Sequence, residues 1–181
     1  MESAYDPGMK ARNRLFLIVP ALLLLMLLAA LPAAGQSSAS SVGLGVAVGL
    51  AFPQGDTPGI TSTDWRTSFN WGFYVNIPII STLHLTPSSE LYRFEGTNAT
   101  DFSLAFKFII PLPRFDLYVG LVPGLTAFQD LLAPNVGILA GGSFRLVGNL
   151  DLFVQGKYDW IFESGDNLRV LHVNTGVLFL F

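Results

Sequence analysis

Large apolar residues alternate with small or polar ones along most of the chain beyond residue 41. An alternation of period two is typical of β-strands, because successive side chains point to opposite faces of a sheet. Clusters of Pro, Gly, Asn, Asp and Ser separate the alternating segments and mark the turns. The pattern predicts an all-β chain with about eight strands of roughly ten residues each. The expected strands cover residues 42–52, 67–77, 82–95, 102–110, 116–128, 135–147, 151–160 and 168–181.

The last of these strands has two unlike faces. Its apolar face carries Leu171, Val173, Thr175, Val177, Phe179 and Phe181. Its mixed face carries Val170, His172, Asn174, Gly176, Leu178 and Leu180. An exposed apolar terminal strand is an aggregation hazard in a soluble protein. The stretch resembles the C-terminal strand signal of bacterial outer-membrane β-barrels, whose polar, glycine and two hydrophobic positions are filled by Asn174, Gly176, Phe179 and Phe181. This resemblance implies that the envelope's barrel-assembly machinery is a partner during insertion.

The third predicted strand breaks the alternation. Leu83 and Leu85 lie opposite His84, but the phase slips at residues 87–89, where a proline precedes two serines. Because proline donates no hydrogen bond to a strand ladder, the slip predicts a β-bulge there. Beyond the bulge, Tyr92 and Phe94 are expected to join the apolar face.

The two faces differ in size as well as in polarity. One is almost uniformly large and apolar, whereas the other is mainly Gly, Ala, Asn and Ser with a few charges. Small residues suit the interior of a narrow barrel, and a transmembrane barrel has an apolar exterior and a polar lumen. Lipid cannot satisfy an open sheet edge, so the sheet must close. The pattern therefore predicts a closed, antiparallel, up-and-down transmembrane β-barrel of eight strands.

This architecture assigns the strand connections to two ends. Loops are expected at one end, near residues 53–66, 95–101, 129–134 and 162–168. Tight turns are expected at the other end, near residues 78–81, 111–115 and 148–150. Aromatic residues near strand ends would form an interfacial belt: Trp71, Tyr92, Phe94, Phe128, Trp160 and Phe162. Polar residues of the inner face would form a paired network in the lumen: Lys107, Arg145, Asp151, Gln155, Lys157 and Asp159.

Residues 1–35 have the three parts of a cleaved secretory signal peptide. An apolar run over 15–31 precedes small residues at 32–35 and follows three basic residues, Lys10, Arg12 and Arg14. The run of about 17 residues also reaches the lower limit for a transmembrane anchor, which is the alternative. Met9 is an alternative start. The expected mature chain covers residues 36–181.

Composition narrows the function further. Only 13% of the residues are charged, against roughly a quarter in soluble domains. A formal net charge of −3 argues against nucleic acid, which requires a basic surface. The absence of cysteine excludes disulfides, thiol catalysis and cysteine-ligated zinc. The two histidines are not accompanied by clustered carboxylates, so we expect no metal site, and we expect no cofactor.

The predicted mature chain as a whole resembles the small eight-stranded outer-membrane barrels of the outer-membrane protein A and X type. The resemblance implies an integral protein of the cell outer membrane that contacts its lipid and acts as a monomer. We expect it to have no enzymatic activity. Its role would be structural, in envelope integrity, or in surface interaction, with a partner that the sequence does not identify. A narrow porin-like channel is the alternative. A lipid A-modifying enzyme and a soluble periplasmic lipid-binding barrel are further hypotheses.

The two histidines do not favour an enzyme. A serine hydrolase needs a histidine beside its serine and an acidic residue to orient it. His84 is followed by Thr86, and His172 is followed by Asn174, so neither matches the Phe-x-His-x-Ser pattern of the outer-membrane deacylases. No catalytic residue is predicted.

Overall fold

A computed structural model describes residues 41–54, 67–94, 97–112, 115–128, 131–162 and 167–181. These residues form eight β-strands, and the predicted signal peptide lies outside them. The strands are β1 (Gly43–Gln54), β2 (Ser68–Ile80), β3 (Leu83–Phe94), β4 (Thr97–Pro111), β5 (Phe115–Phe128), β6 (Leu131–Val147), β7 (Leu150–Phe162) and β8 (Asn167–Leu180). In this part of the chain, no helix is long and apolar enough to cross a membrane.

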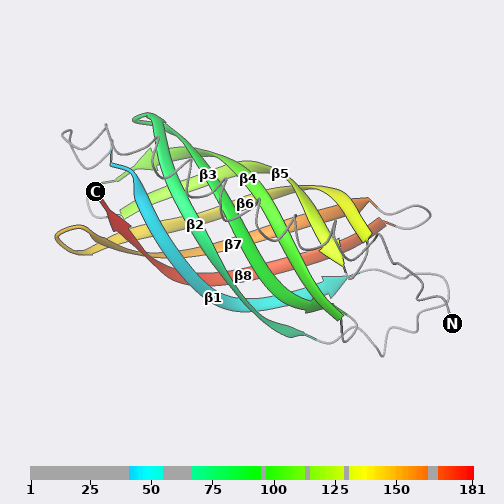
Figure 1. The fold of residues 1–181 in the computed structure, drawn as a ribbon. Helices are drawn as coiled ribbons and strands as arrows, with labels where there is room; N and C mark the ends of the chain where they lie inside the picture. Colours follow the sequence, from blue (N-terminus) through cyan, green and yellow to red (C-terminus); the bar gives the residue numbers. More distant parts are fainter. Residues whose placement is uncertain (1–40, 55–66, 95–96, 113–114, 129–130, 163–166) are drawn as a thin grey trace, which may run out of the picture.

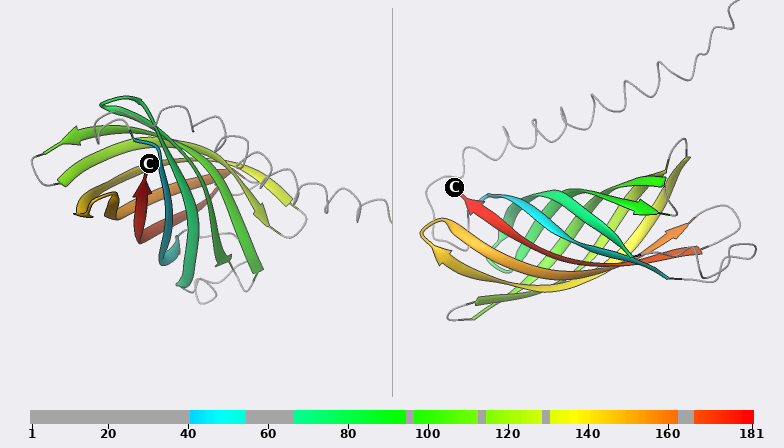
Figure 2. Two further views of the ribbon diagram at one scale, coloured as in Figure 1. Left: turned by 60° about the vertical axis from the view of Figure 1, so that its left-hand side comes forward. Right: turned by 90° about the horizontal axis from the view of Figure 1, so that it is seen from below.

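The strands close into one barrel. Each strand pairs antiparallel with the next in chain order, and β1 pairs with β8, with Ala47 opposite Gly176. Figure 1 shows the first strand (cyan) beside the last (red), and Figure 2 shows the same tilted barrel from two further sides. The prediction of a closed up-and-down barrel of eight strands is confirmed.

Two ends of the barrel differ in their connections. The end that holds Ser41 and Phe181, named here the terminal end, also holds the short β2–β3 and β6–β7 connections. Gly148 in the β6–β7 turn has a φ of 52°, in the left-handed region that glycine adopts without strain. The connection between β4 and β5 lies at the terminal end too, and the opposite end, named the distal end, holds the connections that follow β1, β3, β5 and β7. Two of these are shorter than predicted, because β4 begins at Thr97 and β6 at Leu131.

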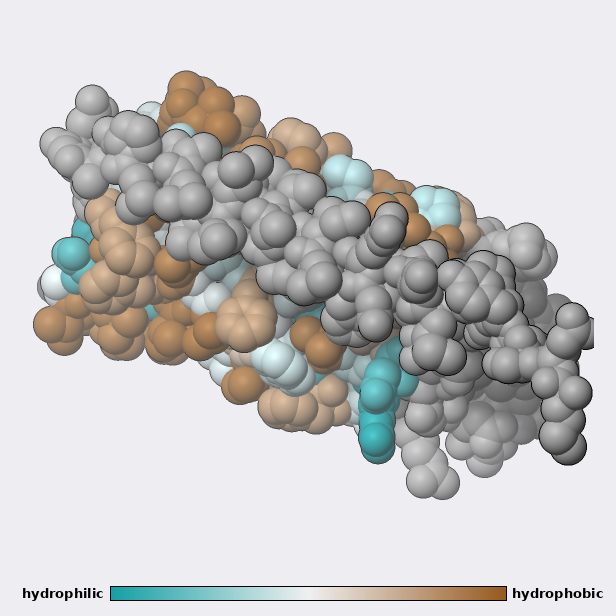
Figure 3. All heavy atoms as spheres, viewed as in Figure 1, coloured by the Kyte–Doolittle hydropathy of each residue, from teal (hydrophilic) through white to brown (hydrophobic). Residues whose placement is uncertain are grey.

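The outer face of the barrel is apolar. Outward side chains of every strand except β3 include large exposed hydrophobic residues, as for Leu121 on β5, which is 60% exposed. Figure 3 shows hydrophobic side chains covering most of the visible outer surface of the strands. The inner face carries buried Asn, Ser, Thr and charged residues. A soluble lipid-binding barrel requires the reverse arrangement, so that hypothesis is wrong.

Strand β3 keeps one phase along its whole length, contrary to the predicted bulge. Its register with β4 is unbroken from Leu83↔Phe108 to Phe94↔Thr97. His84, Thr86, Ser88, Glu90 and Tyr92 therefore share the inward face. Tyr92 is 4% exposed and lies inside the barrel, so its assignment to the aromatic belt was wrong.

The other belt residues divide into three groups. Trp71, Trp160 and Phe162 lie on the outward face, where Trp160 stacks edge-on against Tyr158 with ring centroids 4.8 Å apart. Phe128 instead packs against buried residues at the distal end, because it continues the inward phase of Thr126. Its assignment to the belt was also wrong. The side chain of Phe94 lies outside the described residues.

Candidate functional site in the lumen

The lumen is filled in layers, and the inward face of β7 passes through each of them. From the distal to the terminal end this face carries Ile161, Asp159, Lys157, Gln155, Phe153 and Asp151. Ile161 belongs to an apolar layer at the distal end, here called the distal plug, with Ala51, Tyr92, Ala99, Ala133, Leu168 and Val170. An ionic layer, an aromatic layer and a polar cavity follow in that order.

The ionic layer is built around one buried lysine. The Lys157 ammonium lies 2.6 Å from Asp101 Oδ2, 3.1 Å from Asp159 Oδ2 and 3.3 Å from Glu90 Oε2. Together with His172, these four residues are named the ionic cluster. Each of the five side chains is at most 2% exposed. Charges this deeply buried persist only when they are paired and hydrogen-bonded.

Neutral donors complete the pairing of the carboxylates. Asp101 accepts hydrogen bonds from Ser103 (2.8 Å), Thr126 (3.2 Å) and the Asn135 amide. Glu90 accepts one from the Tyr74 hydroxyl at 2.8 Å, and Asn174 donates to that hydroxyl at 3.0 Å. The donors come from β2, β4, β5, β6 and β8. The cluster therefore ties together strands on all sides of the barrel.

His172 contributes an imidazole to the cluster. The Asn70 amide nitrogen lies 2.9 Å from Nδ1, and Nε2 lies 3.4 Å from Asp159 Oδ2. Tyr92 stacks edge-on against the imidazole, with ring centroids 4.8 Å apart. The histidine is thus held between the ionic layer and the distal plug.

Inward glycines make room for these polar side chains. A Cβ at Gly137 would overlap the carboxylate of Asp159, and one at Gly49 would overlap the amide of Asn174. The alternation of small residues on the inner face is therefore the complement of the polar residues that cross the lumen. A larger residue at either position would displace the side chain beneath it.

Aromatic side chains close the lumen on the terminal side of the ionic cluster. Tyr74 and Phe153 stack edge-on with ring centroids 5.5 Å apart. Tyr118 and Lys107 both donate to Gln155 Oε1 at 3.4 Å. All of these residues are buried.

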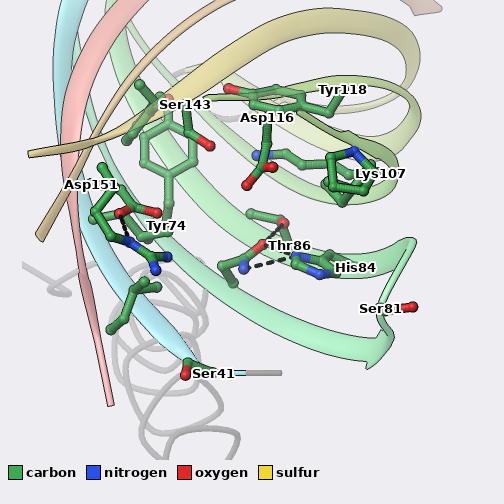
Figure 4. Close-up of a pocket in the computed structure, with 17 residues that line it drawn as sticks. Ser41, Tyr74, Ser81, His84, Thr86, Lys107, Asp116, Tyr118, Ser143 and Asp151 are labelled. Atoms are coloured by element: carbon green, nitrogen blue, oxygen red, sulfur yellow. Dashed lines mark hydrogen bonds and ion pairs between the residues drawn. The ribbon is translucent and has the colours of Figure 1, made fainter. Parts of the chain in front are cut away.

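A polar cavity opens at the terminal end beyond the aromatic layer. Figure 4 shows side chains from several strands reaching into it, among them Lys107, Asp116 and Asp151. Arg145 lies at its mouth, where its side chain is 41% exposed and its Nε lies 3.1 Å from Asp151 Oδ1. His84 is hydrogen-bonded to Asn76 deeper in the cavity.

The predicted lumen network is thus two separate groups in the structure. Lys157 and Asp159 belong to the ionic cluster, whereas Lys107, Arg145 and Asp151 line the terminal cavity, with Gln155 between the groups. The prediction missed Glu90, Asp101 and Tyr74 as members of the network. The four residues of the C-terminal signal also divide by phase: Asn174 and Gly176 face the lumen, and Phe179 and Phe181 face outward.

The buried polar side chains of this layer pair with one another across the lumen. Among the described residues, no group of three or more His, Asp or Glu is arranged to hold a metal ion. His172 lies between Asn70, Tyr92 and the carboxylates of Glu90 and Asp159, and its ring is fully buried. The side chains of the ionic cluster are 0–2% exposed, so water does not reach this layer. The lumen is therefore sealed at this layer.

Comparisons with known proteins identify the fold. No protein-family model and no curated protein match the sequence. The crystal structure of Neisserial surface protein A is similar with a TM-score of 0.65 and 16% identity over 77% of this chain and 97% of that one. The N-terminal β-barrel domain of Pseudomonas aeruginosa OprF is similar with a TM-score of 0.50 and 16% identity over 77% and 98%. The outer membrane enzyme PagL has a TM-score of 0.47 and 14% identity over 76% and 98%. The chain has the fold of the small outer-membrane barrels.

Proposed function

We propose that this chain is an integral outer-membrane barrel with a plugged lumen and no enzymatic activity, which supports the envelope or presents its distal loops to a surface partner. The observation that best supports this proposal is that the barrel combines an apolar exterior with an ionic layer that seals the lumen. An exterior of exposed large hydrophobic residues is stable in lipid and costly in water. Because the barrel has an even number of strands, its first and last strands both have their free ends at the terminal end. In the proposed orientation this end faces the periplasm, and the distal loops face the outside of the cell.

A gel-mobility experiment tests the membrane part of the proposal. A closed lipid-embedded barrel keeps the hydrogen bonds between its strands in cold detergent, because it has no edge strand with unpaired backbone groups. We expect the protein to fractionate with the outer membrane and to migrate differently on a gel before and after boiling. A heat-independent band in the soluble periplasmic fraction would contradict the proposal.

The sealed ionic layer argues against the channel hypothesis. An ion crossing the lumen would have to separate Lys157 from three carboxylates and to pass the distal plug. Steady conductance of the purified barrel in planar bilayers would favour the channel over the plugged barrel. The enzyme hypothesis is weakened by the position of His172, which cannot reach a lipid substrate outside the barrel from its buried site.

We further propose that β8 is the element that the barrel-assembly machinery recognises. Phe179 and Phe181 project from the outer face with ring centroids 5.0 Å apart, next to the seam where β1 pairs with β8. Deletion of Phe181 is expected to reduce the amount of folded barrel in the outer membrane several-fold. Refolding of the purified variant in detergent is expected to change little, because Phe181 follows the last residue of β8 and its backbone N–H donates a single hydrogen bond, to the Val42 carbonyl at 2.8 Å.

The Phe181 experiment compares folded protein in cells with folded protein in vitro, using heat-dependent mobility for both. A Val147→Ala variant, which shortens an exposed residue of the β6–β7 turn, serves as the control. Equal loss of folded protein in cells and in vitro would assign Phe181 a role in stability instead of recognition.

A further inference from the structure

The terminal cavity is lined by a buried cation that has no carboxylate at contact distance, although the more distant Glu90 attracts it. Lys107 is 8% exposed, its ammonium donates to Gln155 at 3.4 Å, and it lies 4.7 Å from the centre of the Tyr118 ring. No carboxylate oxygen of the described residues lies within 4.0 Å of this ammonium. Lys157, by contrast, has three carboxylates in that range. An amide oxygen and an aromatic face compensate a buried ammonium only in part, so the site favours an anion.

The same cavity contains a carboxylate in the reverse situation. Asp116 on β5 is half-buried, and among the described residues no Lys, Arg or His nitrogen lies within 4.0 Å of its oxygens. Its carboxylate accepts a hydrogen bond from the Leu112 backbone N–H, and Arg145 attracts it from beyond contact distance while pairing with Asp151. Figure 4 shows Lys107 and Asp116 reaching into one space from the neighbouring strands β4 and β5. Both charges therefore line the same cavity, and neither has an ion-pair partner at contact distance.

The size of the cavity suits a small molecule. Its volume is about 80 Å³, whereas one water needs roughly 10–15 Å³ of such space. It is closed toward the barrel centre by Tyr74 and Phe153 and reaches the surface at Arg145. A simple anion would match Lys107 but would add negative charge beside Asp116. A simple cation would match Asp116 but would add positive charge beside Lys107.

We propose that the terminal cavity binds a small zwitterion of the amino-acid class, with its carboxylate on Lys107 and its ammonium on Asp116. One such ligand supplies both missing counter-charges, and it leaves the Arg145–Asp151 pair intact. Hydrogen bonds to charged groups are stronger than those between neutral groups, so the two contacts provide affinity. They also determine which end of the ligand lies at Lys107 and which at Asp116. The site is independent of the proposed envelope role, because it requires only the folded barrel.

Titration of the isotope-labelled barrel in detergent micelles tests this site. Glycine is expected to shift the amide resonances of cavity residues such as Ser143, Asp151 and Gln155 in a saturable way. Acetate and ethylammonium each supply one half of the ligand, and each is expected to bind at least about tenfold more weakly than glycine. Lys107→Met and Asp116→Asn are each expected to weaken glycine binding by about tenfold.

Controls separate binding from folding. Arg93→Met removes one exposed cation at the distal end of β3 and is expected to leave glycine binding unchanged. Heat-dependent gel mobility shows whether each variant is folded. Equal binding of glycine and acetate, both lost in Lys107→Met, would overturn the zwitterion in favour of an anion site. No saturable shift with glycine in the unaltered barrel would show that water alone fills the cavity. Neither result would alter membrane fractionation, so failure here is distinguishable from failure of the proposed function.

Discussion

Replacement of Lys157 by Met is expected to lower the free energy of unfolding of the barrel by about 3–5 kcal/mol, the range found when one partner of a buried ion pair is removed. Methionine retains most of the length of the lysine side chain, so the packing volume changes little. The substitution leaves Glu90, Asp101 and Asp159 facing one another without their common cation, in a layer at most 2% exposed. Urea unfolding in lipid vesicles, followed by gel mobility, measures the change.

Two further variants separate charge from packing in this experiment. Arg145→Met breaks an ion pair at the mouth of the barrel, where 41% of the arginine side chain is exposed, and is expected to cost less than about 1 kcal/mol. Combining Lys157→Met with Asp159→Asn is expected to be less destabilising than the sum of the single changes, because both charges of one pair are removed. Equal costs for Lys157→Met and Arg145→Met would show that the ionic cluster does not stabilise the lumen.

The alternation of residues was sufficient to predict the fold and much of the inner face. On β7 it correctly separated outward Leu152 and Val154 from inward Lys157 and Asp159. On β8 the same alternation placed His172 with Asn174 on the mixed face, and both are buried in the lumen. These strands were predictable because a period of two admits only two assignments, and membrane-type barrels require the large apolar set outside.

The errors arose where a local signal was given more weight than the alternation. Pro87 suggested a bulge, but the register between β3 and β4 continues through Pro87↔Leu104, so Glu90 and Tyr92 keep the inward phase of His84. Asp101 was assigned to a loop because turn-forming residues precede it, whereas β4 already begins at Thr97. In both places the unbroken period of two was the better guide.

The partners of each lumen residue could not be predicted from the sequence. Lys157 on β7 contacts Glu90 on β3 and Asp101 on β4, which lie across the barrel and not beside it in the ladder. Such contacts depend on the stagger of the strands around the barrel, which alternation along one strand does not encode. The division of the predicted network into an ionic cluster and a terminal cavity has the same cause.

Replacement of Leu121 by Arg tests whether the outer face contacts lipid, just as Lys157→Met tests whether the ionic cluster stabilises the inner face. Leu121 is 60% exposed in the middle of β5, where its strand neighbours Phe106 and Ile138 are also exposed. A charged side chain on the lipid face near the bilayer midplane costs about 2–4 kcal/mol, and the cost falls to about 0–1 kcal/mol near the interface. We therefore expect Leu121→Arg to destabilise the barrel in vesicles by about 2–4 kcal/mol.

The matched control for Leu121→Arg is Val147→Arg, which adds the same side chain to an even more exposed residue at the terminal end. Val147 is 78% exposed at the β6–β7 turn and is expected to tolerate arginine at a cost of about 0–1 kcal/mol. In water, arginine would cost little at either site, because both residues lie on the surface. A difference of at least about 1 kcal/mol between the variants therefore requires lipid around the middle of the barrel. Similar, small effects for both variants would mean that the apolar exterior is covered by something other than a bilayer.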